Sequence, residues 1–585
     1  MSVMDPVSRL IQISKTPSDK AAFETWLKMD DAVAFLKDNI HEDEFVVYAS
    51  TECMFIHAVL APSASVNPPD VEDLMRWGHN PYSSWGISVS YSGGKPGPVS
   101  IVPPLESTGT KTLEGGEQLI FGRDFEGRVG DKNYYEVLQK FTHLFGLHFL
   151  ESRSAYCRLD KHGDIEDVIR IIQIPGRGTQ YGGTIIAFKR NVLDEYMVLT
   201  DSTIVRMFDV TRYQHHHFGG WSDSYEVQST EEPDLFYRSH VEPGHASYMR
   251  GCQIVPSLTP KETILKHHHN WGEDEEGKQY ASFITLDWKN GVVREVSCAP
   301  GGTANYFTKS EMPFETSPVF FRPEVLSKYK ADSEKYRLED RSITCRGAWH
   351  LQTYDINDAG QVHTYIVYLR NLPYEEQLYW KAHNEKPKGT ISKRAYKSDF
   401  EASWDQEYDP LSNLKGALHE WDATRVPWWT LRSEKLPDQV HYPVTASPDE
   451  WANEILQLDQ FVVEGFETKW LRTMAGELRK TPDAKVASLV LIEECLTGFG
   501  YSEEDARKIV APLKTVHYLR TKLKGHASGV ESISAIRKET LAEHGSYKKH
   551  FRVLAEQIDH SIRAIEDAFP KPAGIVEHAG SKAQT

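Results

Sequence analysis

The sequence predicts an α+β fold, with a mixed N-terminal region, a β-rich middle region and an all-α C-terminal helical bundle. Two observations lead to this class. The middle of the chain carries short apolar runs and an Asn-Gly turn between apolar alternations at Asn290 and Gly291, the strongest short-range signal of a hairpin. The last third carries long stretches with helical periodicity and a capping sequence, Ser447-Pro448-Asp449-Glu450.

The length of 585 residues is too great for a single hydrophobic core, so several domains are expected. We expect a mixed α/β domain over residues 1–150 and a β-rich domain over 151–435, which serves as a sensor or ligand module. A helical domain is expected over 443–570, followed by a disordered polar tail over 571–585.

In the N-terminal region, residues 21–39 place apolar side chains at near-helical spacing and predict one amphipathic helix. Residues 44–60 predict one or two strands, and residues 133–149 predict a second helix. Between them, residues 90–116 are rich in Gly, Ser, Thr and Pro, which predicts a long surface excursion.

In the middle region, residues 168–172 and 184–188 predict buried strands, because each is a short apolar run bounded by polar residues. One hairpin is expected over 283–296. A second is expected from 348–356 through a turn at 357–360 into 362–369. Residues 384–429 are polar and aromatic with little periodicity, and they predict an irregular connection.

In the C-terminal region, the capping sequence at Ser447 predicts a helix over about 451–478. Further helices are expected over 484–496, from Ser502 to Gly525, over 531–543 and over 546–569.

Composition restricts the functional class. The net charge of −18 argues against non-specific coating of nucleic acid, so any such contact must be local. The six cysteines are scattered without a CxxC pair, as in reduced intracellular proteins. No apolar run is long enough for a signal peptide or a membrane span, so a cytoplasmic protein without a membrane partner is expected.

One basic block stands out in this acidic chain. Residues 505–565 hold twelve Lys and Arg against six Asp and Glu, and Arg520 and His526 lie near its centre. RNA cleavage without a metal needs a base for the 2′-hydroxyl proton, which a histidine supplies, and a cation for the scissile phosphate, which an arginine supplies. Lys514, Lys522 and Lys524 would add contacts to RNA. The alternative is a helix end at Gly525, with basic residues that complement the helix dipole.

The run Tyr518-Leu519-Arg520-Thr521-Lys522-Leu523-Lys524-Gly525-His526-Ala527 resembles the signature of the HEPN superfamily, small helical domains found in prokaryotic toxins and antiviral proteins. The resemblance covers residues 448–569. It implies a metal-independent endoribonuclease effector of antiviral defence or a toxin system, active as a homodimer and regulated here by the β-rich domain. It assigns phosphate stabilisation to Arg520 and acid–base catalysis to His526. The family commonly has Asn, Asp or His directly after the arginine, where this chain has Thr521.

Two alternatives stay open. The chain is a non-catalytic binding protein whose helical domain mediates dimerisation, and whose β domain holds a ligand through Arg346, Trp349 and His350 on one cationic, aromatic sheet. Alternatively, the histidines at 215–217 and 267–269 bind a transition metal for a metal-dependent enzyme. Because no HExxH and no Cys/His set at ligand spacing occurs, no metal and no cofactor is expected.

Overall fold

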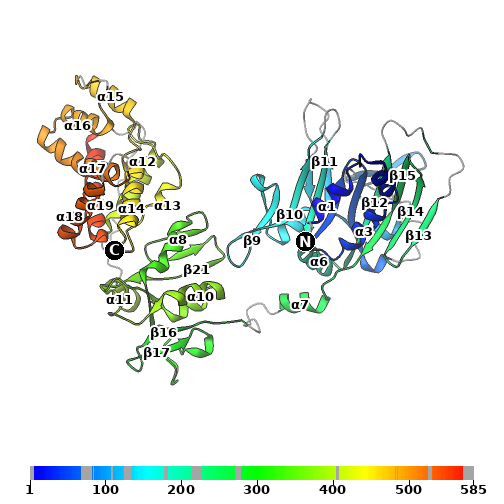
Figure 1. Cartoon of the computed structure of the whole chain (residues 1–585), viewed down its shortest axis with the longest axis horizontal. Helices are drawn as coiled ribbons and strands as arrows, with labels where there is room; N and C mark the ends of the chain where they lie inside the picture. The colour runs from blue at the N-terminus through cyan, green and yellow to red at the C-terminus, as the bar shows by residue number, and fades with distance from the viewer. Residues whose placement is uncertain are drawn as a thin grey trace. The chain divides into compact units, whose positions relative to one another are not determined.

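The computed structural model divides the chain into two compact units (Figure 1). Unit 1 comprises Met1–Asp160 and Ile165–Gly277, and unit 2 comprises Lys161–Asp164 and Lys278–Thr585. The structure describes residues 5–66, 82, 85–106, 110–123, 134–176, 182–213, 220–221, 227–269, 278–403, 408–480, 483, 485–524 and 530–570. The predicted α+β class is confirmed: unit 1 and the first part of unit 2 contain sheets, and the rest of unit 2 is helical.

Unit 1 is built on a large, mainly antiparallel sheet. Its described strands follow the order β13-β14-β15-β12-β2-β1-β11-β10-β9-β8, with β5 paired to β2. The strands are β1 (Glu44–Ser50), β2 (Met54–Pro62), β5 (Glu117–Gln118), β8 (His148–Leu150), β9 (Ala155–Leu159), β10 (Ile165–Ile174), β11 (Gly183–Lys189), β12 (Ser202–Tyr213), β13 (Gln228–Glu231), β14 (Leu235–Glu242) and β15 (Ala246–Val255).

The predicted boundary at residue 150 falls inside this sheet. β1 pairs with β11, and β2 pairs with β12 over nine residue pairs from Ser202–Pro62 to Val210–Met54. The predicted strands at 44–60, 168–172 and 184–188 are all present as β1, β2, β10 and β11. Strands from before and after residue 150 are interleaved in one sheet, so the first compact unit continues past this residue to Gly277.

Helices cover both faces of this sheet. α1 (Pro6–Ile13), α2 (Lys20–Trp26) and α3 (Asp30–Asp38) pack on the face that carries Val46, Ala49 and Ile185. α5 (Gln139–Leu144) and α6 (Arg190–Leu199) pack on the face that carries Phe45, Val47 and Ile186. Residues of β1 thus point into two separate cores, and a register shift between Val46 and Tyr48 interrupts the strict alternation, so that Val47 and Tyr48 lie in the same core.

Two helix predictions in unit 1 are wrong in their extent. Residues 21–39 form α2 and α3 rather than one helix, because Met29 between them adopts a left-handed backbone with φ 67°. Residues 133–149 contain β7 (Tyr134–Val137), the short α5 and β8 instead of one helix. Burial of Tyr135 and Val137 in the sheet core outweighs the helical spacing of the segment.

The remaining elements of unit 1 are short. β3 (Gly86–Ser92) and β4 (Lys95–Val102) form an exposed hairpin in the first part of the surface excursion expected over 90–116. The later part does not fit that prediction, because Leu105 and Leu113 are buried in a hydrophobic core. β6 (Ile120–Arg123) pairs with β7. The other described elements are η1 (Ser63–Ser65), η4 (Lys111–Leu113), η5 (Glu151–Arg153) and α7 (Lys261–His269).

Unit 2 begins with two smaller sheets. One has the order β17-β16-β18-β23-β22 with β24 paired to β18, and the other has the order β19-β20-β21. The strands are β16 (Ser282–Asp287), β17 (Val292–Ser297), β18 (Pro318–Phe321), β19 (Tyr336–Leu338), β20 (Ile343–Cys345), β21 (Trp349–Leu351), β22 (Asp355–Ile356), β23 (Val362–Tyr365) and β24 (Asn384–Glu385). Around them lie η6 (Pro300–Gly302), η7 (Pro323–Leu326), α8 (Ser327–Ala331), α9 (Ile366–Arg370), α10 (Tyr374–His383) and α11 (Lys393–Phe400).

The two predicted hairpins have different outcomes. The β16–β17 hairpin is confirmed, and Gly291 in its turn has φ 66°, a conformation that favours glycine. In the second, only β22 and β23 pair across the predicted turn. β21 pairs with β20 instead, and residues 366–370 form α9, so the second hairpin is shorter than predicted.

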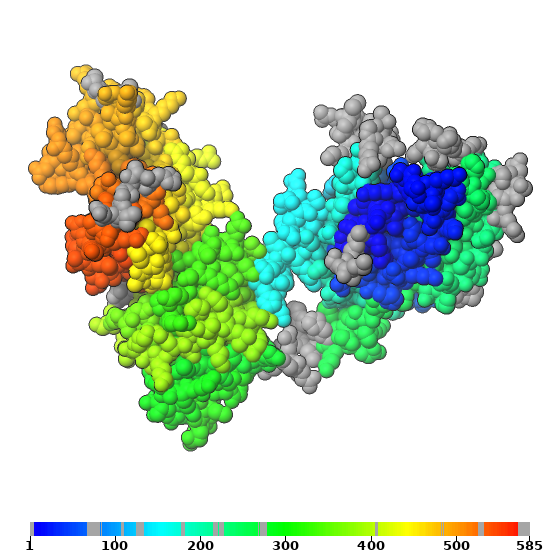
Figure 2. All heavy atoms as spheres, in the orientation of Figure 1, coloured from blue at the N-terminus to red at the C-terminus, as the bar shows by residue number. Residues whose placement is uncertain are grey.

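The rest of unit 2 is helical and contacts the small sheets; in Figure 2 its atoms are coloured from yellow to red and adjoin the green atoms of the first part of unit 2. The helices are α12 (Pro410–Thr424), α13 (Leu436–Gln439), α14 (Pro448–Val462), α15 (Thr468–Glu477), α16 (Ser488–Gly498), α17 (Glu503–Lys524), α18 (Val530–His544) and α19 (Tyr547–Ala568). The predicted irregular connection over 384–429 is wrong, because this segment contains α11 and α12. α12 packs against α19 and contributes Leu414 and Trp421 to the core of the helical bundle.

The predicted C-terminal helices are present with altered bounds. The helix expected over 451–478 is divided into α14 and α15, and Val463, Phe466 and Trp429 pack in the core at the break. The predicted tail over 571–585 lies outside the described residues. Within the described part of the chain, no helix is both long and apolar enough to cross a membrane.

Candidate functional site

The second half of α17 carries the arginine that the sequence singled out. Ser502 precedes this helix, and its hydroxyl accepts a hydrogen bond from the amide of Asp505 at 3.0 Å. Val516 and Leu519 are buried in the core of the bundle. His517, Arg520 and Lys524 recur at helical spacing along one side of this buried stripe, where His517 and Lys524 are exposed and Arg520 is partly exposed.

A buried carboxylate of α14 holds two of these side chains. Asp459 is fully buried, and its Oδ1 lies 3.1 Å from Nδ1 of His517. Its Oδ2 lies 3.7 Å from Nε of Arg520. His517 and Arg520 are nevertheless partly exposed, with side-chain exposures of 47% and 35%. The arrangement presents an imidazole and a guanidinium to solvent side by side from a fixed anchor; we call these three residues the α17 cluster.

The electrostatics of the α17 cluster follow from the burial of Asp459. Burial raises the pKa of this carboxyl above its usual value, and the neighbouring His517 and Arg520 counteract the rise. The carboxylate accepts a hydrogen bond from Nδ1–H of His517, so Nε2 is the nitrogen left with a lone pair. A histidine held in this way is oriented to accept a proton from a substrate.

The carboxylate of Glu464 competes with any bound phosphate for the guanidinium of Arg520. Its Nη2 donates a hydrogen bond to Oε1 of Glu464 at 3.2 Å, and the Glu464 side chain is 40% exposed. An anionic ligand must therefore replace Glu464 at the guanidinium, whereas Asp459 can remain behind it as the anchor.

The three lysines predicted to bind RNA lie in different surroundings. Lys514 pairs with Glu493 of α16 at 2.7 Å, which neutralises it. Lys522 lies over the ring of Tyr518, 5.7 Å from its centroid. Lys524 is exposed at the end of α17, on the same face as Arg520. Lys524 thus lies about one helical turn after Arg520 on the same side of α17. Lys514 lies nearly two turns before Arg520 and is held in its ion pair.

The predicted partner of Arg520, His526, lies outside the described residues, as does Gly525. Sequence reasoning missed Asp459 and His517. His517 stands three residues before Arg520 in the sequence, and this spacing is a signal for a shared helix face. Asp459 lies 58 residues before His517, and no local pattern connects the two.

The predicted ligand surface at Arg346, Trp349 and His350 is not assembled. These residues were expected on one strand, but Arg346 and Gly347 have φ of 44° and 84° and form the turn between β20 and β21. Trp349 is buried in the core, where it packs near Tyr329 and Tyr336. His350 alone of the three is exposed on the strand, so no stacking platform for a base results.

The histidine clusters give no metal centre that can be described. His215–His217 and the side chains of His267 and His269 lie outside the described part of the structure, whereas Nε2 of His268 lies 2.7 Å from Glu195. Within the described residues, no group of three or more His, Cys, Asp or Glu side chains is arranged to hold a metal ion.

Comparison of the chain with protein-family models, with curated proteins and with solved structures gives no match. The function of the site is therefore argued from its own geometry.

Proposed function

We propose that this protein is a metal-independent endoribonuclease whose active site is the α17 cluster together with His526. The observation that carries the proposal is the pairing of a solvent-facing imidazole and guanidinium on one buried carboxylate, Asp459. The resemblance of residues 518–527 to the HEPN signature supports the same reaction. As in that family, we propose that the active form is a homodimer.

The proposed reaction is an internal phosphoryl transfer. Nε2 of His517 takes the proton of the 2′-hydroxyl, and the resulting oxygen attacks the adjacent phosphorus. The bond from phosphorus to the 5′-oxygen breaks, and His526 gives a proton to that leaving oxygen. The products are a 2′,3′-cyclic phosphate and a 5′-hydroxyl, so no water, metal or redox partner is consumed.

Arg520 stabilises the charge that builds on the phosphate. Its planar fork of donors matches two phosphate oxygens, and a guanidinium stays charged throughout the physiological pH range. In the free protein this fork contacts Glu464, and bound RNA would take the place of that carboxylate. Lys522 and Lys524 extend the cationic surface along the backbone of the RNA.

The test compares cleavage of single-stranded RNA by the wild type with four variants. We expect His517→Ala, His526→Ala and Arg520→Ala each to lower the rate by about 100-fold or more, since each removes one transition-state contribution. The matched control is Arg507→Ala, because Arg507 lies on the same helix in an exposed ion pair with Glu503. Equal rates for the wild type and all three site variants would refute the proposed active site.

A second candidate is the non-catalytic binding protein. It is favoured by the ion pair of Arg520 with Glu464, because a helix surface whose charges are already paired serves equally well for docking. The two functions are separated by His517→Ala, which abolishes cleavage in the first and leaves binding intact in the second.

A further inference from the structure

A pocket of about 560 Å³ lies inside unit 2, and none of the residues of the α17 cluster lines it. One wall comes from the segments around β19, β22 and α11, and the other comes from α12, α13, the segment that follows it and the start of α19. Its size is that of a site for a small organic ligand.

The pocket has an apolar part that suits a planar or aliphatic group. The side chains that form it are Leu326, Leu338, Tyr354, Ile356, Leu411, Leu418, Leu431, Val440, Val444 and Phe461. Several of them belong to the two hydrophobic cores of unit 2, so this part of the wall is fixed by packing.

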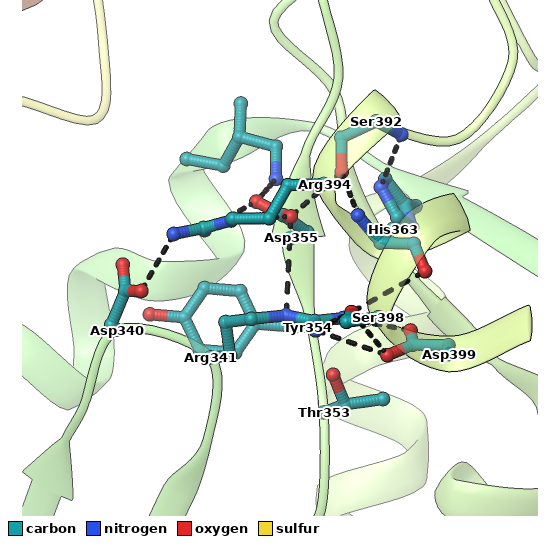
Figure 3. A network of polar contacts seen from close by, with 12 residues as sticks. Asp340, Arg341, Thr353, Tyr354, Asp355, His363, Ser392, Arg394, Ser398 and Asp399 are labelled. Carbon is teal, nitrogen blue, oxygen red and sulfur yellow. Dashed lines mark hydrogen bonds and ion pairs between the residues drawn. The ribbon is translucent and has the colours of Figure 1, made fainter. Parts of the chain in front are cut away.

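The sheet-side wall is fixed by a network of ion pairs (Figure 3). Asp355 is almost fully buried and accepts two hydrogen bonds from Arg394, at 2.7 and 3.0 Å, and one from the Ser392 hydroxyl at 2.7 Å. Arg394 also reaches Asp340 at 2.6 Å. The charge of Arg394 is thereby balanced by two carboxylates, and this arginine forms a rigid wall rather than a free cation.

The helix-side wall is fixed in the same way. Lys330 donates at 2.6 Å to both Glu450 and Glu454. Glu454 in turn accepts a hydrogen bond from the backbone amide of His441 at 2.9 Å, which holds the segment that carries His441 and Tyr442. The hydroxyl of Tyr442 donates to Asp409 at 2.7 Å.

Two lysines of this pocket differ from the other cations around it. Lys415 of α12 and Lys548 of α19 both line the pocket, and neither forms an ion pair or hydrogen bond through its ammonium with a described residue. Burial by the pocket walls lowers the pKa of each ammonium below its usual value. Carboxylates act on both lysines without a direct ion pair: Asp438, Glu454 and Asp409 on Lys415, and Asp355 and Asp340 on Lys548. Each ammonium therefore keeps its donors available for a charge-assisted hydrogen bond to an anionic ligand.

Other polar groups complete the recognition surface. Burial lowers the pKa of His441 to about 3, so its imidazole is neutral and offers a hydrogen bond without charge. The carboxylates of Asp422 and Asp438 line the same pocket and can accept hydrogen bonds from hydroxyl or amino groups of a ligand.

We infer that this pocket binds a small organic phosphate of the nucleotide class. Lys415 and Lys548 hold the phosphate, Asp422 or Asp438 accepts hydrogen bonds from sugar hydroxyl or base amino groups, and the apolar wall packs against the base. This inference does not depend on the ribonuclease proposal, because none of the pocket residues belongs to the α17 cluster.

The experiment is calorimetric titration of the full chain with AMP, GMP, CMP and UMP, each in turn. The chain carries Arg520→Ala, so that binding at the proposed RNA site does not contribute. We expect at least one mononucleotide to bind with a Kd below about 1 mM. Lys415→Met and Lys548→Met should each weaken binding by about tenfold or more, since each removes one charge-assisted contact and keeps the apolar stem.

Lys549→Met is the matched control, because Lys549 is the neighbour of Lys548, is exposed like it, and does not line the pocket. It should change the Kd by less than about twofold. Inorganic phosphate and the matching nucleoside, titrated separately, should each bind more weakly than the mononucleotide. Circular dichroism of each variant confirms that it is folded.

Two results would overturn the inference. One is the absence of binding for all four mononucleotides at millimolar concentration. The other is binding that both lysine substitutions leave unchanged, which would place the ligand elsewhere. Inorganic phosphate that binds as tightly as the mononucleotide would contradict the role of the apolar wall.

Discussion

At the scale of single residues, the ion-pair partner of Arg520 determines how readily the α17 cluster binds an anion. Glu464 occupies the guanidinium in the free protein at 3.2 Å, and both side chains are partly exposed. Exposed pairs of this kind contribute up to about 1 kcal/mol, so the carboxylate is easily displaced but still competes with RNA.

Removing this competitor should strengthen RNA binding. We expect Glu464→Gln to lower the Kd for single-stranded RNA by up to about fivefold, which corresponds to the loss of an opposing contribution of about 1 kcal/mol. Fluorescence anisotropy of labelled RNA measures this change. Glu503→Gln, in an exposed pair with Arg507, is the control and should have no effect. Weaker binding by Glu464→Gln would show that this carboxylate positions Arg520 instead of competing for it.

A second residue links stability to pH. His363 is buried, its Nε2 accepts a hydrogen bond from the amide of Ser392 at 3.0 Å, and burial lowers its pKa from 6.5 to about 4. In the unfolded chain the pKa returns to about 6.5, so between these values the unfolded state binds more protons. The contribution of the neutral His363 to the free energy of unfolding is therefore complete above pH 6.5 and is lost as the pH falls toward 4.

The expected size of this loss is about 2 kcal/mol between pH 7 and pH 5, from about 1.4 kcal/mol per pH unit below 6.5. Urea unfolding of the wild type and of His363→Gln, followed for unit 2 at both values of pH, measures it. The variant should lose about 2 kcal/mol less than the wild type. The same pH dependence in both proteins would mean that His363 is not held neutral.

At the scale of elements, α14 illustrates what the sequence predicts well. Ser447 is the N-cap as predicted, with its hydroxyl 3.3 Å from the amide of Glu450. The Glu450 carboxylate accepts hydrogen bonds from the amides of Val444 and Thr445 at 2.9 and 2.7 Å. These contacts join residues that are close in the sequence, so a local sequence pattern is sufficient to predict them.

Ser447→Ala should therefore destabilise unit 2 by about 1 kcal/mol, the usual cost of removing an N-cap side chain. Chemical unfolding monitored by tryptophan fluorescence measures the change. Ser488→Ala is the matched control, because Ser488 stands inside the start of α16, where Ala487 is the N-cap. That control should stay within about 0.5 kcal/mol of the wild type. If Ser447→Ala had the same free energy of unfolding as the wild type, the N-cap side chain would contribute nothing to the stability of this helix.

Elements whose conformation depends on distant partners were predicted poorly. α12 lies in a segment without clear periodicity, and it is stabilised by burial of Leu414 and Trp421 against α19, more than 100 residues later. β7 has helical spacing but pairs with β6. Asp459 belongs to the candidate site through a contact with His517 that no local pattern encodes. Arg520 was found because its chemistry and its helix were both visible in the sequence.

At the scale of the whole molecule, the charge distribution limits how RNA is bound. The chain carries a net charge of −18, so attraction to RNA must come from few cations and must be sensitive to salt. Lys514 is paired with Glu493, which leaves Arg520, Lys522 and Lys524 as the predicted contacts on α17.

Three phosphate contacts predict a slope of about −2 for the logarithm of the RNA association constant against the logarithm of salt concentration. Lys524→Ala should reduce the magnitude of this slope by about 0.7, whereas Lys514→Ala should leave it unchanged. Binding titrations at a series of salt concentrations measure both. A slope near zero would exclude phosphate contacts as the basis of binding.

The central claim is that the protein cleaves RNA without a metal through the α17 cluster and His526. The most direct test is incubation of the full chain with single-stranded RNA in EDTA, followed by analysis of the product ends. The account predicts products with 2′,3′-cyclic phosphate and 5′-hydroxyl ends that disappear in His517→Ala and in His526→Ala. Absence of cleavage, products with 3′-hydroxyl ends, or cleavage that survives both substitutions would contradict it.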